Sequence, residues 1–217
     1  MKRIERSKLF PYTISEDIAN SVSHGVAAIL VAILNVYLIY RASVSGNVTA
    51  VITFAIYGYT LMLMFLMSCL YHGIWHYTTR DIFKRLDHSF IFLVILASYC
   101  PIVFVGIKTT LAYWVFAILV VVTILGIFFK VFFSDRFKVL STVIFILMGW
   151  FSLLLIPQMI DILSFDFMLW LVIGGVAYTL GAILYAVGKF KYHHFVWHLF
   201  VIIGAFAHYY AILKYLI

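Results

Sequence analysis

Charged residues are scarce in this sequence: Asp, Glu, Lys and Arg together make up only 11% of its 217 positions. Hydrophobic residues account for 66% of the chain, and the mean hydropathy is +1.13. Soluble globular domains contain about a quarter charged residues, so these values lie far outside their range. The sequence also lacks internal repeats, low-complexity tracts and any polar segment long enough for a separate soluble domain. Composition therefore excludes a soluble protein and indicates one embedded in a membrane.

Cysteine is nearly absent from the sequence. Cys69 and Cys100 both lie within long apolar runs, where we interpret them as small apolar side chains and not as a disulfide.

We expect no cleavable signal peptide at the start of the sequence. The first apolar run begins only after Glu16 and Asp17 and is longer than the apolar region of a signal peptide. We therefore expect this run to stay in the protein as its first span.

The few charges fall in clusters that leave seven long apolar windows between them. A helix needs about 20 apolar residues to cross the hydrocarbon core of a bilayer, and each window is long enough. The sequence therefore predicts an all-α integral membrane protein, with residues 1–217 forming one seven-transmembrane helix bundle. The predicted spans are residues 19–40, 50–74, 88–107, 110–129, 139–157, 167–188 and 194–214.

Two prolines bear on the shape of these spans. Proline has no backbone N–H and clashes with the preceding helical turn, so it kinks or ends a helix. We expect Pro101 to kink the third span and Pro157 to end the fifth.

Basic residues are distributed unequally between the two sides of this topology. Twelve of the 15 lysines and arginines fall on the side of the N-terminus, and only Arg41, Lys108 and Lys214 fall on the other side. By the positive-inside rule, the N-terminus is cytoplasmic and the C-terminus lies outside. The net charge of +7 is thus explained by topology, and we expect no nucleic-acid partner.

Three histidines from distant parts of the chain fall at the same depth in this topology. His72 lies near the cytoplasmic end of the second span, and His194 and His198 lie in the first turns of the seventh. Residues four apart share one face of a helix, so His194 and His198 could chelate one ion. Three histidines and a water are a common ligand set for catalytic zinc, which lowers the pKa of that water to about 7. We expect Zn²⁺ as the cofactor.

Two further polar residues are candidates for catalysis beside this site. Asp87, in the first turn of the third span, could hold or deprotonate the zinc-bound water. Ser68, one helical turn before His72, could orient that histidine or a substrate carbonyl. We expect Glu16 and Asp17 to lie on the same side but nearer the water.

Other polar residues are expected to support the site without binding the metal. Thr13 and Glu16 have the spacing of a capping box, which predicts a helix that begins in the cytoplasm and continues into the first span. Asn20 and His24 then follow Glu16 at helical spacing on the face toward the site. We expect Asn20, His24 and Tyr71 to contribute hydrogen bonds around the ligands.

His208 is a further histidine within the last predicted span, and the polar residues also have an alternative interpretation. His208 lies about ten residues deeper in the last span, too far along the helix to share the ion, so we expect it to bond another helix or to line a cavity. The alternative for all these polar groups is that they are interfacial residues whose polar ends reach the lipid headgroups.

Several short motifs give the chain a family resemblance. They are Glu16–His24 (EDIANSVSH), Ser68–His72 (SCLYH), Arg85–Ser89 (RLDHS), Lys138–Ser141 (KVLS) and His194–His198 (HFVWH), followed by Gly204 and His208.

With these motifs, the chain resembles the bacterial hemolysin III family, within the superfamily of progestin and adipoQ receptors. It also shares the histidine, aspartate and serine pattern of alkaline ceramidases. The resemblance implies seven helices with the N-terminus inside, in the inner (plasma) membrane of a bacterium. It also implies zinc held by His72, His194 and His198, with Asp87 reaching zinc through water and Ser68 nearby.

Three functions remain open at this point. The leading hypothesis is a zinc-dependent hydrolase of a lipid amide or ester, with membrane lipids as partners. Close behind is a non-catalytic membrane regulator in which zinc only staples helices. A pore-forming cytolysin is suggested by the family name, but an integral bundle with short loops does not resemble a released toxin. The sequence indicates neither the lipid nor the oligomeric state.

Overall fold

The computed structural model describes residues 9–133 and 138–217, and this part of the chain is almost entirely helical. Seven of its helical segments are long and apolar enough to cross a membrane. The predicted seven-helix bundle is therefore confirmed. The elements are α2 (Ile14–Val44), α3 (Val48–Gly73), α4 (Tyr77–Pro101) with the π-helix Ile102–Ile107, α5 (Thr110–Phe133), α6 (Lys138–Trp150), the 3₁₀-helix Phe151–Leu155, α7 (Ile156–Ile162), α8 (Phe165–Val187) and α9 (His193–Tyr215).

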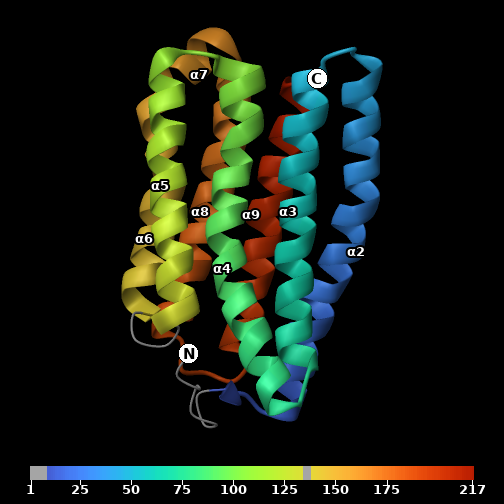
Figure 1. Cartoon of the computed structure of the whole chain (residues 1–217), viewed down its shortest axis with the longest axis vertical. Helices are drawn as coiled ribbons and strands as arrows, with labels where there is room; N and C mark the ends of the chain where they lie inside the picture. Colours follow the sequence, from blue (N-terminus) through green and yellow to red (C-terminus); the bar gives the residue numbers. More distant parts are fainter. Residues whose placement is uncertain (1–8, 134–137) are drawn as a thin grey trace.

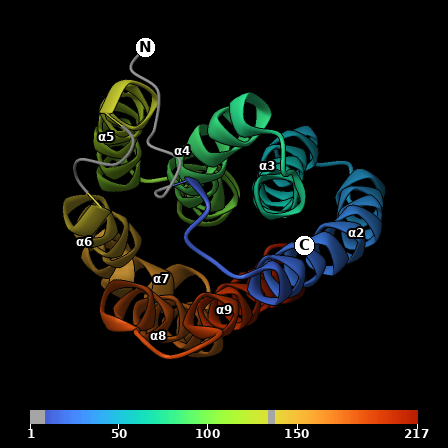
Figure 2. The same ribbon diagram turned by 90° about the horizontal axis from the view of Figure 1, so that it is seen from below.

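The helices form a ring when the bundle is seen along its long axis (Figure 2). Along one arc α2, α3, α4 and α5 follow one another as packed neighbours, and along the other α6 packs on α8 and α8 on α9. The ring is completed on one side by α9, which packs against α2, the first span. The start of α2 and the C-terminus lie at opposite ends of the bundle (Figure 1). We call the end that holds the start of α2 and the start of α9 the N-terminal end.

The first span begins earlier than its apolar run because its start is capped. Thr13 and Glu16 form the predicted capping box, which starts α2 at Ile14, five residues before the predicted span at residue 19. The second carboxylate oxygen of Glu16 accepts a hydrogen bond from the backbone N–H of Tyr192, at 2.9 Å, just before α9. One side chain thus fixes the first turns of both the first and the last span, which face each other at the N-terminal end.

The two prolines act differently from each other. Pro101 is the last residue of α4, and the span continues beyond it as the π-helix Ile102–Ile107. The prediction that Pro157 ends the fifth span is wrong, because the span runs on to Ile162. There the chain tightens into the 3₁₀-helix Phe151–Leu155, and Pro157 occupies the first turn of α7. Proline is tolerated in a first turn because the N–H that it lacks has no partner there.

Polar groups are buried inside the ring, whereas the outer face is apolar. On α5, for example, Trp114 is 66% exposed and Ile124 is 62% exposed, as expected for side chains in contact with lipid. The buried polar side chains of the N-terminal half of the bundle include Asp17, Asn20, His24, Ser68, His72, Arg80, Asp87, Lys130, His194 and His198. Polar side chains inside a membrane protein are energetically costly and commonly mark a functional site. This cluster is therefore the candidate functional site.

Candidate metal centre

Three histidines from two helices meet inside the N-terminal half of the bundle. His72 comes from the last turn of α3, and His194 and His198 from the first turns of α9. One ring nitrogen of each lies within 4.8 Å of the others, so the three could hold one metal ion. All three side chains are buried. Within the part of the chain that the structure describes, the group contains three histidines and no cysteine, aspartate or glutamate.

Hydrogen bonds on the far side of two rings decide which nitrogens face the centre. His72 Nδ1 donates to Asp17 Oδ1 at 2.8 Å. His198 Nδ1 donates to the backbone carbonyl of Asn20 at 3.2 Å, since a carbonyl oxygen can only accept. The proton of each ring is therefore on Nδ1, and Nε2 keeps a lone pair for a metal.

The distance between the facing nitrogens fits two ligands of one ion. His72 Nε2 lies 3.1 Å from His194 Nε2, and His198 Nε2 is buried without a hydrogen-bond partner. Two nitrogens bound to one tetrahedral zinc are separated by about 3.3 Å, given Zn–N distances of about 2.0–2.1 Å. The donor type of all three histidines, and the spacing of the His72 and His194 nitrogens, therefore suit a zinc ion.

The N-terminal segment covers this site from the end of the bundle. The Tyr12 ring stacks on His194 with a centroid distance of 4.7 Å and lies 5.6 Å from His72. Burial raises the pKa of the Tyr12 hydroxyl well above its usual range, so this cover is uncharged. An uncharged aromatic ring thus lies directly against two of the three histidines.

The predicted catalytic pair, Asp87 and Ser68, lies outside the histidine group. Asp87 is only 4% exposed, and its carboxylate has the Ser68 hydroxyl, Lys84 and Lys130 as close electrostatic neighbours. Ser68 is itself buried beside that carboxylate. Of the two, Asp87 belongs to the wall of the cavity described below.

The residues predicted to support the ligands lie against them in different ways. His24 stacks face to face on His198, with ring centroids 3.6 Å apart and planes 7° apart, and neither of its nitrogens has a hydrogen-bond partner. Asn20 contributes its backbone carbonyl to His198, and its side-chain nitrogen lies 3.5 Å from His72 Nδ1. Tyr71 packs beside His72 with a centroid distance of 4.4 Å.

Asp17 is the main contact that the sequence interpretation missed. We expected this residue nearer the water, and that expectation is wrong, because its side chain is 1% exposed and bonded to His72. It lies on the same helix face as Asn20 and His24, at spacings of three and seven residues. That spacing was the available signal, but an acid in a first helical turn is also typical of a solvated helix start.

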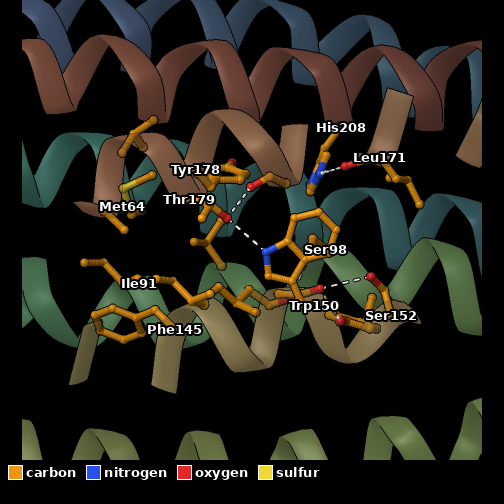
Figure 3. Close-up of a pocket in the computed structure, with 18 of the residues that line it drawn as sticks. Met64, Ile91, Ser98, Phe145, Trp150, Ser152, Leu171, Tyr178, Thr179 and His208 are labelled. Atoms are coloured by element: carbon orange, nitrogen blue, oxygen red, sulfur yellow. Dashed lines mark hydrogen bonds between the residues drawn. The ribbon is translucent and has the colours of Figure 1, made fainter. Parts of the chain in front are cut away.

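A cavity of about 170 Å³ lies beside the histidine centre, next to His24, and extends toward the opposite end of the bundle. Its wall includes His24 and Asp87 near the centre and Trp150 and His208 farther away. The polar groups at the far end are satisfied by the protein, since Trp150 Nε1 donates to Thr179 Oγ1 at 2.9 Å and His208 Nε2 donates to the Leu171 carbonyl at 3.1 Å (Figure 3). His208 thus lines the cavity and bonds another helix, as predicted.

The fold and the site define a class: a multi-pass membrane protein with a buried three-histidine centre beside an apolar cavity. The model of the family described as "Haemolysin-III related" matches residues 12–209, and the chain belongs to this family. The resemblance seen in the motifs is therefore confirmed.

Similar proteins come from bacteria and from animals. "Hemolysin-3 homolog" of Bacillus subtilis is 35% identical over 204 residues, covering 94% of this chain and 96% of the relative. "Hemolysin-3" of Bacillus cereus is 36% identical over 204 residues, covering 94% and 93%. The human "Monocyte to macrophage differentiation factor" is 30% identical over 210 residues, covering 94% and 86%. The alignments span nearly the whole chain, so they include all seven helices.

Proposed function

We propose that this protein is a zinc-dependent hydrolase that cleaves an amide or ester bond of a membrane lipid. The observation that carries the proposal is a buried three-histidine group beside an apolar cavity, whose wall includes Asp87 and His24, the residue that stacks on His198. An acyl chain fits the apolar part of such a cavity, and the polar bond of the lipid would then lie near the histidines. The plasma membrane of a bacterium is the proposed location.

The chemistry of the ligands supports zinc as the metal. His72, His194 and His198 would hold the ion through neutral imidazoles, leaving a fourth position open, as in catalytic zinc sites. When bound, zinc would supply a water of lowered pKa and an electrophilic centre for a carbonyl oxygen.

The remaining groups would act on the proton and on the substrate. Asp87 would take the proton of the attacking water and return it to the leaving group. The Ser68 hydroxyl, which lies beside Asp87, would donate to the substrate carbonyl. The unpartnered nitrogens of His24 would bond the polar part of the lipid next to His198.

The test is hydrolysis of ceramide-like amides and acyl esters by purified protein, with wild type and Asp87→Asn compared at equal zinc occupancy. Loss of a general base costs about 10²-fold or more in rate, and Asp87 is outside the metal group, so the variant should keep its zinc. Asp161→Asn, an exposed acid on α7, is the matched control and should keep full activity. Equal rates in wild type and Asp87→Asn would remove Asp87 from the mechanism.

A second candidate function is a non-catalytic membrane regulator with structural zinc. The three histidines belong to α3 and α9, so a bound metal would join two helices far apart in sequence. Absence of hydrolysis by both wild type and Asp87→Asn, together with lower thermal stability after zinc removal, would favour this alternative.

The names of the two Bacillus relatives also motivate an erythrocyte-lysis assay, in which lysis that survives loss of the histidines would support a cytolysin.

A further inference from the structure

Arg80 holds several chain segments together next to the histidine centre. It lies in the first turn of α4, and its side chain is completely buried. Nε donates to the Leu9 carbonyl at 2.9 Å, and Nη1 donates to the carbonyls of His72 and Ile74 at 3.4 and 3.3 Å. Nη2 donates to both carboxylate oxygens of Asp17, at 2.9 and 2.8 Å. The guanidinium thus fixes Asp17 of α2 relative to the end of α3.

Asp17 transmits this arrangement to a candidate metal ligand. Its Oδ1 accepts from Arg80 at 2.9 Å and from His72 Nδ1 at 2.8 Å. A ligand histidine is oriented by the group that accepts its second N–H, and losing that group weakens metal binding. With Arg80 holding the carboxylate, the rotation of the His72 ring and the position of its Nδ1 proton are both fixed. Nε2 then points at His194.

The surroundings of Arg80 keep this connection out of water. The guanidinium carbon lies 4.6 Å from the centre of the Phe10 ring, 5.0 Å from that of Tyr71 and 5.7 Å from that of Trp75. A buried ion pair is weak evidence for stability, because desolvation of both charges offsets their attraction. The second side-chain partner of Asp17, a histidine of the metal group, gives the pair a more specific role.

We propose that Arg80 is a positioning residue of the metal centre, acting through Asp17 on His72; the inference rests on the metal site of the proposed function. Arg80 and Asp17 touch neither the metal position nor the substrate cavity. Their effect is on metal affinity and on the symmetry of the ligand field.

The first measurement compares wild type, Asp17→Asn and Asp81→Asn as full-length chains in detergent. Zinc affinity is measured by competition with a chelator, and the ligand field by the absorption spectrum of the Co²⁺-loaded protein. Asp17→Asn should lower zinc affinity by about 10- to 100-fold and change the Co²⁺ spectrum. Asp81 forms the matched control, since it is a second buried aspartate whose Oδ1 pairs with Arg85 Nε at 3.2 Å on α4. Asp81→Asn should leave affinity and spectrum unchanged.

The second measurement asks whether Arg80 acts through Asp17. Arg80→Lys keeps the positive charge, so a folded protein is expected, but it loses the two-pronged contact with the carboxylate. It should lower zinc affinity less than Asp17→Asn does. In the Asp17→Asn background, Arg80→Lys should cause little further loss, because two residues in one chain of contacts are not additive.

The outcomes separate this inference from the proposal on which it depends. Wild-type affinity and spectrum in folded Arg80→Lys would overturn the positioning role, even if Asp17→Asn does not fold. Fully additive losses in the double variant would show that Arg80 acts independently of Asp17 and would overturn the route. A wild-type protein that binds neither Zn²⁺ nor Co²⁺ would instead overturn the metal site itself, and the inference with it.

Discussion

Removing two of the three histidines tests the metal centre most directly. In wild type, we expect about one zinc per chain, since the structure brings one group of three donors together. In the double variant His194→Ala with His198→Ala, only His72 remains, and one imidazole does not retain zinc against a chelator. Zinc content, measured on protein purified in detergent, should therefore fall from about one to near zero.

The size of the stability effect follows from ligand binding. A metal that binds only the folded protein stabilises it by about 2.7 kcal/mol when free metal is 100 times the dissociation constant. We expect wild type to show this gain as a zinc-dependent rise in Tm of several degrees, and the double variant to show none. Because the His194 and His198 rings are buried, their removal also leaves cavities. Each protein must therefore be compared with itself, with and without zinc.

A neighbouring histidine provides the control. His193 directly precedes His194 but bonds the Phe190 carbonyl through Nδ1 at 3.0 Å, so His193→Ala should retain both zinc and the zinc-dependent rise in Tm. Unchanged zinc content and an unchanged Tm shift in the double variant would refute the assignment of this site.

Two further predictions concern topology and packing. A reporter fused after Ile217 should be found outside the cytoplasm, and a cytoplasmic reporter would contradict the orientation drawn from the basic residues. Gly174→Ala should destabilise the protein by about 1–3 kcal/mol, the usual range for overpacking, because a Cβ there would lie 2.3 Å from the His208 ring and 3.0 Å from the Gly204 carbonyl. Thermal unfolding should show this loss, and Gly149→Ala, whose Cβ meets nothing within 4 Å, should unfold like wild type.

The number and order of the helices could be predicted because the bilayer imposes a length on each span. Charges cluster toward the ends of the spans, so the seven apolar windows between them predicted seven helices. The helix ends were less predictable. At Pro157 the local cue is ambiguous, since proline ends one helix and begins another equally well, and here it begins α7.

The histidine group could be predicted because it depends on depth and helical spacing alone. Topology placed His72 at the depth of α9's first turns, and the four-residue spacing placed His194 and His198 on one face. Asp17 could not be recognised in the same way. Its burial depends on Arg80, which is 63 positions away in sequence and reaches it from a different helix. Pairings of this kind require the three-dimensional arrangement.

The position of the ligands also sets an order on assembly during synthesis. His72 belongs to the second span to be made, whereas His194 and His198 belong to the last. No ion can be held by all three until α9 has been synthesised and has packed against α2, where Glu16 bonds the Tyr192 N–H. Until then Asn20, His24 and His72, which the finished bundle buries, lack their neighbours from the last span. Metal capture is therefore a late event, and a chain truncated before α9 cannot complete it.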